Sequence, residues 1–336
     1  MKTNLLTAAL LLATTVFFAQ DNGNKVFYLD SLHNITTEKK FFYTRTVEDY
    51  NSKKDLYVVT DYYHPSGKIN MSATSKNKDV LRLEGTRTDY YENGNKKQES
   101  NYVNNRLNGK QISWYESNVK KSEKEITWDT NNKTSETNVI AFWNPEGKQT
   151  VIDGNGQVED SDEDNFEKGE IKDGKKHGIW TGKNLKEKIS YSEIYKNGNL
   201  TSGISSDESN NKFPYKKITE KPTPAKGMDD FYMFIGKNFK MPKQEDINGR
   251  VLTKFIINKN GYITDIEIVK SLREDLDKQA IQLISQYGNW IPGKKRGIPR
   301  IETFTLPISV KSPTGSNQIH YSQPGTDIIK NTNPNW

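Results

Sequence analysis

A turn motif recurs along this 336-residue chain between about residues 57 and 203. The segment Gly85–Gly94 aligns with Gly109–Asn118, and Tyr62–Lys68 aligns with Phe142–Lys148. Each copy has two adjacent aromatic residues, then a tight turn such as Asn-Gly or Pro-x-Gly, and then a strand rich in Lys, Glu and Thr, which predicts a β-hairpin. One hairpin cannot bury its aromatic face alone, so the repetition predicts a stacked hairpin array with the aromatic pairs in its core.

Composition excludes several classes of protein. The chain has no cysteine, which rules out disulfides, cysteine-ligated zinc, iron–sulfur clusters and a cysteine nucleophile. Hydrophobic residues make up only 32% of the chain, yet aromatic residues make up 11%, too many for a disordered protein. The net charge of +6 is small, with Lys and Glu interleaved, so we expect no nucleic-acid partner. The length suggests roughly two domains.

The N-terminus is predicted to be a signal peptide, residues 1–20. Lys2 precedes the uncharged apolar run Leu5–Ala19, which is shorter than the ~20 residues needed to span a bilayer. We expect cleavage near Ala19 or Gln20 and export to the periplasm or cell envelope. The alternative is an uncleaved membrane anchor, because Phe17 and Phe18 are bulky for a cleavage site. Without a cysteine, lipidation as a lipoprotein is excluded.

Residues 21–210 are interpreted as the repeat region, and at its aromatic–turn motifs the sequence resembles the MORN-variant repeat family. The match is irregular, since Asn118 and Asn105 stand where glycines are expected. The resemblance implies a twisted β-hairpin array that scaffolds or binds, and it does not imply an enzyme.

No catalytic, cofactor or metal site is predicted. The acidic stretch Asp153–Glu167 begins like a calcium loop at Asp160-x-Asp162-x-Asp164, but Ile171 occupies the position that requires a bidentate glutamate. We interpret it as a solvated acidic loop. The four histidines lie far apart in the sequence, and none belongs to a catalytic motif.

The last third of the chain has a different pattern. A Pro- and Lys-rich linker is predicted at residues 211–227. Periodicity then predicts a helix, two strands joined by a hairpin turn, a second helix and a last strand, at residues 228–239, 249–257, 262–270, 274–287 and 300–310. The predicted fold class is a mainly β hairpin-repeat array followed by a small α+β domain of order α-β-β-α-β, with two helices and a three-stranded antiparallel sheet.

Turn and corner motifs in this segment resemble the TonB C-terminal domain family over residues 228–312. They are Gly249-x-Val251, Asn258-x-x-Gly261 and Trp290-x-Pro292-Gly293-x-x-x-Gly297-x-Pro299. The resemblance implies a periplasmic domain that engages TonB-dependent outer-membrane receptors by pairing an edge strand with an extended partner segment. Trp290 and Pro292 are interpreted as a structural corner.

If the resemblance holds, the last strand is the exposed edge. The predicted partner-binding residues are Arg300, Ile301, Glu302, Thr303, Phe304, Thr305 and Leu306. An equally weighted alternative is that this edge forms a homodimer or is covered by the tail, residues 313–336, which we expect to be flexible.

Three functions remain open at this stage. The first is an exported TonB-like protein that binds an outer-membrane receptor or another periplasmic protein and is associated with transmembrane transport. The second is a membrane-anchored energy transducer, which requires the N-terminal segment to remain uncleaved. The third is a repeat-based envelope scaffold or adhesion protein.

Overall fold

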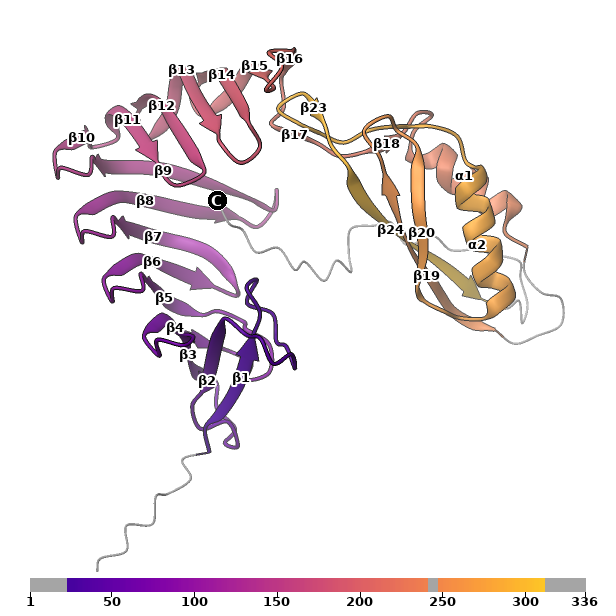
Figure 1. The fold of residues 1–336 in the computed structure, drawn as a ribbon, viewed down its shortest axis with the longest axis horizontal. Coiled ribbons are helices and arrows are strands. Elements are labelled where there is room, and N and C mark those ends of the chain that lie inside the picture. Colours follow the sequence, from indigo (N-terminus) through magenta and orange to yellow (C-terminus); the bar gives the residue numbers. More distant parts are fainter. Residues whose placement is uncertain (1–22, 241–246, 312–336) are drawn as a thin grey trace, which may run out of the picture. The chain divides into compact units, whose positions relative to one another are not determined.

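The computed structural model describes residues 23–240 and 247–311. The predicted signal peptide and the predicted tail lie outside these residues. The described chain consists of a long hairpin sheet followed by an α+β domain, which confirms the predicted fold class (Figure 1).

The hairpin sheet contains sixteen strands in the order in which they occur in the sequence, each next to its sequence neighbours. This order is the simplest one for repeated hairpins, because each strand pairs with the strand before it and the strand after it. The strands are β1 (Lys25–Leu29), β2 (Tyr43–Val47), β3 (Tyr57–Tyr63), β4 (Ile69–Ser75), β5 (Gly85–Tyr90), β6 (Lys96–Val103), β7 (Arg106–Trp114), β8 (Lys120–Asp129), β9 (Thr134–Trp143), β10 (Gln149–Ile152), β11 (Asn155–Ser161), β12 (Asn165–Lys172), β13 (Lys175–Asn184), β14 (Ile189–Lys196), β15 (Asn199–Ser206) and β16 (Lys212–Tyr215).

The turns explain why Asn replaces Gly in some copies. Gly94, Asn118 and Gly147 occupy equivalent positions, with φ of 94°, 68° and 82°. This left-handed region favours Gly, but Asn tolerates it better than most residues do. Asn105 likewise has φ of 63°, directly after Asn104 with φ of 51°, as a type I′ turn requires.

Tyrosine hydroxyls connect successive hairpins of the array. In each case a tyrosine that begins one turn donates to the backbone carbonyl just before the next turn along the array. The three bonds run from Tyr63 to Tyr90 at 2.8 Å, from Tyr91 to Trp114 at 2.9 Å and from Tyr115 to Trp143 at 2.9 Å. We call this set the tyrosine ladder. The aromatic pairs therefore join neighbouring hairpins, and most of their members are half-buried, whereas Phe142 is buried at 4% exposure.

The C-terminal domain has the predicted α-β-β-α-β order. Its elements are α1 (Met228–Asn238), β19 (Asn248–Ile257), β20 (Ile263–Lys270), α2 (Glu274–Gln286) and β24 (Glu302–Lys311). The three strands form an antiparallel sheet in the order β20-β19-β24, and Figure 1 shows both helices beside it. Alternate residues of β19, among them Val251, Phe255 and Ile257, are fully buried in one core with the apolar residues of α1, α2 and β24.

Trp290 lies at the centre of this core, as expected for a structural corner. It is 3% exposed, and its ring packs edge-on against Phe231, Phe255 and Phe304 at centroid distances of 5.3, 5.8 and 5.0 Å. The segment around it also forms short strands that periodicity did not indicate, namely β21 (Trp290–Ile291), β22 (Lys294–Lys295) and β23 (Ile298–Pro299).

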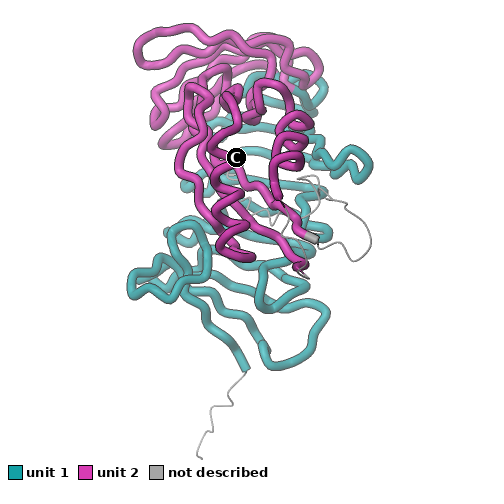
Figure 2. The backbone as a smooth tube through the Cα atoms, turned by 90° about the vertical axis from the view of Figure 1, so that its right-hand side faces the viewer, with its two compact units in different colours: residues 1–158, 171–175 teal, residues 159–170, 176–336 magenta. Residues whose placement is uncertain are grey.

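The segment expected to be a linker, residues 211–227, contains three short strands. β16 pairs with β15 in the array, β17 (Thr219–Glu220) pairs with β22, and β18 (Thr223–Pro224) pairs with β21. The chain divides into two compact units, residues 1–158 with 171–175, and residues 159–170 with 176–336 (Figure 2). The division thus falls within the array, and the last hairpins belong to the same unit as the C-terminal domain.

Candidate partner-binding edge

The predicted edge strand is the last strand of the C-terminal sheet. β24 pairs with β19 in an unbroken register from Glu302 opposite Ile257 to Lys311 opposite Asn248. Among the described residues no strand pairs with the other side of β24. Such a strand presents unpaired backbone groups, which is the requirement for pairing with an added strand.

The predicted site residues alternate between core and surface. Phe304 packs against Trp290 and Phe255, and Leu306 is 2% exposed, so both belong to the core. Thr303 and Thr305 are exposed. The two threonines are therefore the side chains of this strand that an added strand would meet, whereas Phe304 and Leu306 hold the strand in place.

Two of the seven predicted residues precede the strand. β24 begins at Glu302, so the predicted start at Arg300 was two residues early. The backbone N–H of Arg300 donates to the carbonyl of Gly293 at 2.8 Å, and its guanidinium pairs with the carboxylate of Glu187 in the last hairpins of the array. Ile301 is 59% exposed. Arg300 is therefore engaged within the chain.

Pro307 interrupts the row of donors on the open edge. Proline has no N–H, and a strand tolerates it where its nitrogen faces away from the neighbouring strand. The register with β19 continues through Pro307, and the carbonyl of Leu306 accepts from the Thr253 hydroxyl of β19 at 3.1 Å. The N–H and C=O groups of successive residues point to opposite sides of a strand. Thr303 and Thr305 therefore direct theirs to the open side, which is also the side that the nitrogen and the carbonyl of Pro307 face. Pro307 offers no donor, so the open edge is interrupted there, before Ser309, which faces the same side.

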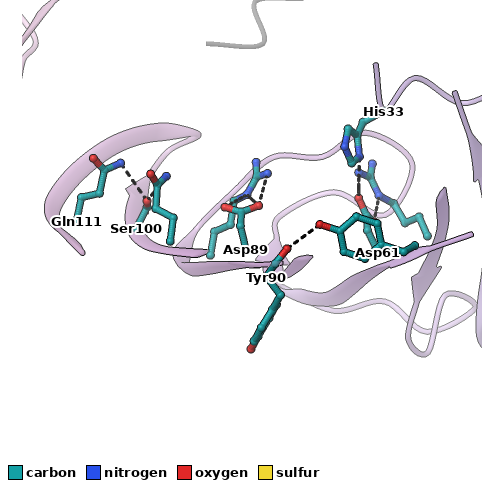
Figure 3. A network of polar contacts seen from close by, with 10 residues as sticks. His33, Asp61, Asp89, Tyr90, Ser100 and Gln111 are labelled. Atoms are coloured by element: carbon teal, nitrogen blue, oxygen red, sulfur yellow. Dashed lines mark hydrogen bonds and ion pairs between the residues drawn. The ribbon is translucent and has the colours of Figure 1, made fainter. Parts of the chain in front are cut away.

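A second group of polar side chains lies on strands β2 to β7 of the array and includes His33, which precedes β2 (Figure 3). The Arg45 guanidinium donates twice to the buried Asp61 carboxylate, at 2.7 and 2.8 Å, and His33 lies 3.6 Å from the same group. Burial alone would raise the pKa of Asp61, but the hydrogen bonds from Arg45 and His33 outweigh it, so the pKa lies below its ordinary value.

Further along the array, on β5 to β7, polar side chains again pair with one another. Arg87 pairs with Asp89 at 2.7 Å, and the Ser100 hydroxyl accepts from Gln98 at 3.1 Å and from Gln111 at 3.2 Å (Figure 3). Arg45 with Asp61 and Gln111 with Ser100 pair across neighbouring strands, whereas the other two pairs lie within one strand. We therefore interpret the group as a polar complement to the apolar cluster that β2, β3 and β4 also contain.

Within residues 23–240 and 247–311 no group of three or more His, Asp or Glu side chains is arranged to hold a metal ion. The prediction of one acidic loop over Asp153–Glu167 was wrong, because most of this stretch forms β11 and the start of β12. In the short turn between them, Asp162 accepts hydrogen bonds from the backbone N–H of Asp164 at 2.8 Å and of Asn165 at 2.7 Å. His320 lies outside the described residues.

Comparison with known proteins agrees with the C-terminal resemblance. Residues 240–310 match the family model for the Gram-negative bacterial TonB protein C-terminal region. The match contains β19, β20, α2 and β24, and it begins after α1. It supports a TonB-like C-terminal domain, of a family that is non-enzymatic, belongs to the cell envelope and is related to transport. No curated protein matches the chain. The MORN-variant assignment of the array stays a prediction.

The described residues contain no helix with both the length and the apolar character that a membrane span requires. The N-terminal apolar run, on which the anchored alternative depends, lies outside the described residues.

Proposed function

We propose that this chain is an exported, TonB-like envelope protein that binds a protein partner by adding a partner strand to the open edge of β24. The observation that carries the proposal is the edge position of β24 within the segment that matches the TonB C-terminal family. The partner class that the resemblance suggests is a TonB-dependent outer-membrane receptor, and the hairpin array would supply the second surface of the protein.

The open edge is interrupted, which constrains the partner. Pro307 lacks an N–H, so the donors of β24 that face an added strand come from Thr303, Thr305 and Ser309. Both threonine side chains are uncharged. Backbone hydrogen bonds therefore supply most of the affinity, and the partner needs only a few extended residues with small or β-branched side chains.

The test compares two substitutions at one position in the full chain. Thr305→Pro removes a backbone donor from the open side and leaves the pairing with β19 intact, whereas Thr305→Ala removes only the side chain. The probe is a panel of extended peptides from periplasm-facing segments of outer-membrane receptors, with binding followed by NMR shifts of β24. We expect Thr305→Pro to weaken binding about tenfold, the effect of roughly one to two hydrogen bonds, and Thr305→Ala to change it little.

Equal binding by the Thr305→Pro variant and the parent chain would show that the peptide does not pair with this edge. Failure of every peptide to shift β24 signals would count against the proposal as a whole. Concentration-dependent self-association that is lost in Thr305→Pro would instead favour the homodimer alternative.

The repeat-based scaffold remains the second candidate, because the sixteen-stranded array makes up most of the described chain. The scaffold hypothesis and the edge-strand hypothesis predict different results in one experiment. If the array alone captures the ligand, Thr305→Pro leaves ligand capture by the full chain unchanged. The anchored transducer is tested separately by the intact mass of the natively expressed protein, since a signal peptide of about twenty residues is absent after cleavage.

A further inference from the structure

The hairpin formed by β22 and β23 lies against the last strands of the array. Its turn residues Arg296 and Gly297 have φ of 50° and 78°, which defines a tight type I′ turn. A Cβ atom placed on Gly297 would lie 3.1 Å from both the Phe213 Cβ and the Pro214 carbonyl oxygen of β16. The tip of the hairpin therefore contacts the end of the array at backbone distance, and only a residue without a side chain fits there.

The backbone of Arg296 is bonded on both sides. Its N–H donates to the carbonyl of Ile218 at 2.6 Å, and its carbonyl accepts from the hydroxyl of Ser205 at 2.6 Å. Ser205 lies on β15 and is fully buried. These backbone bonds fix the position of the turn independently of the Arg296 side chain.

The Arg296 side chain reaches a buried carboxylate. Glu193 on β14 is fully buried, and its Oε1 accepts from Arg296 Nε at 2.9 Å and from the Tyr215 hydroxyl at 2.7 Å. Its Oε2 accepts from the Tyr195 hydroxyl at 3.0 Å. The guanidinium also lies 3.7 Å from the ring centroid of Tyr191. An isolated carboxylate in this position would be strongly unfavourable, so Glu193 needs the charge that Arg296 supplies.

The surrounding phenols act as neutral hydrogen-bond donors. Burial first, and then the neighbouring Glu193, raises the pKa of Tyr195 and of Tyr215. Burial also raises the pKa of Tyr191 to about 12, although the positive charge of Arg296 opposes that change. These tyrosines stay protonated at neutral pH, so the guanidinium remains the positive partner of Glu193.

A second carboxylate strengthens the contact at its rim. Glu187, in the turn between β13 and β14, pairs with Lys295 at 3.3 Å and with Arg300. Its pKa lies below the ordinary value, because these two cations outweigh the effect of burial. Three cations of the C-terminal domain, Lys295, Arg296 and Arg300, thus pair with carboxylates at the end of the array.

We propose that the β22–β23 hairpin is the cap of the repeat array, and that Glu193 is its specific receptor site. The argument is general for repeat proteins, whose terminal repeat has no following neighbour and needs a capping element. Here β16 is the last strand of the sheet, and the hairpin covers it. The last hairpins and the C-terminal domain then unfold as one cooperative unit, although the sequence places them in different domains.

The experiment measures amide hydrogen exchange in the full chain by mass spectrometry. Arg296→Met removes the charge and keeps much of the side-chain volume, which leaves Glu193 buried without its cation. The double variant Glu193→Gln, Arg296→Met removes both charges. Arg273→Met is the matched control, since Arg273 belongs to the same domain but pairs with the exposed Asp275. Ser205→Ala removes one hydrogen bond to the turn and introduces no buried charge.

We expect Arg296→Met to accelerate exchange of residues 189–215 on the order of a hundredfold, with residues 57–75 unchanged. The double variant should recover at least about tenfold of that loss, because no uncompensated charge remains. Ser205→Ala should accelerate the same segment a few-fold. The control should leave it at the parent rate.

Unchanged exchange of residues 189–215 in Arg296→Met would overturn the proposal. A double variant as fast as the single one would also overturn the receptor role of Glu193, because lost packing would then explain the effect. If Arg296→Met fails to fold, Ser205→Ala decides the question, since an unchanged rate in that variant excludes the cap. None of these readings depends on partner binding at β24.

Discussion

The array and the C-terminal domain are built from the same strands and turns, but they are stabilised differently. In the C-terminal domain, fourteen buried residues from both helices and from β19, β24 and the Trp290 corner form one cluster. The apolar cluster of the array among the described residues contains six, from Val47 to Leu83. Beyond it, neighbouring hairpins are joined by the tyrosine ladder and by polar pairs. A core made from distant segments is lost as a whole, whereas neighbour-to-neighbour contacts are lost locally.

The largest expected effect tests the cooperative side of this comparison. Phe255→Ala removes a fully buried ring that contacts Trp290 and Phe304, and it should destabilise the C-terminal domain by about 3–5 kcal/mol. Amide exchange should rise together in β19, β20 and α2. Tyr262→Ala in the same domain is the control, because Tyr262 is 54% exposed and its loss should change stability by only about 0.5 kcal/mol. Exchange that rises in β19 alone would contradict a single cooperative core.

The buried ion pair of Arg45 and Asp61 tests whether contacts in the array are lost locally. Arg45→Met leaves the Asp61 carboxylate buried without its guanidinium, and we expect a loss of about 3 kcal/mol confined to β2, β3 and β4. Lys54→Met, which removes an exposed pair with Asp49, should cost less than about 1 kcal/mol. Local exchange rates again measure both.

The pH dependence of the same pair sharpens this test. The pKa of Asp61 is lowered in the folded chain, so its contribution is fully present above the ordinary value of 3.8 and is lost as the pH falls through the lowered folded value. Acid unfolding of β2–β4 should therefore be shallower in Arg45→Met than in the parent chain. Parallel acid curves for the two proteins would refute this assignment.

The tyrosine ladder should give the smallest effects. Tyr91→Phe and Tyr115→Phe each remove one hydroxyl-to-carbonyl bond between hairpins, and each should destabilise the array by about 1 kcal/mol. The two losses should add, since they involve different carbonyls. Tyr28→Phe, at a side chain that is 49% exposed and outside the ladder, is the control. Local denaturant-dependent exchange measures the loss of stability in all three variants. Equal losses for the ladder variants and the control would show that the tyrosine ladder does not stabilise the array.

Sequence reasoning succeeded where structure depends on near neighbours. Alternating apolar residues correctly predicted β19 and β24 with their buried faces, and the stripe from Leu276 to Ile284 predicted α2. Asn-Gly and Pro-x-Gly turns predicted the hairpins, because left-handed backbone is a local property. The candidate edge followed from strand order and from the family resemblance, and the missing backbone donor at Pro307 could also have been read from the sequence.

Sequence reasoning missed the contacts that depend on residues far apart in the sequence. No local pattern indicates that Arg296 or Lys295 pairs with a carboxylate of the array, or that Glu193 is buried beside a cation. Residues 211–227 read as a linker, because strands of two residues have no detectable period. β17 and β18 acquire structure only by pairing with residues about seventy positions away, whereas β16 pairs with the neighbouring strand β15.

The amino-acid sequence by itself therefore determined the hairpins, the order of elements in the C-terminal domain and the family that its last strand resembles. Each of these rests on backbone preference and apolar periodicity within a few residues. Only the tertiary structure decided that Arg300 pairs with the array and that Glu193 receives Arg296. A buried charge is stable only beside its partner, and the fold alone brings those two residues, 103 positions apart, within 2.9 Å.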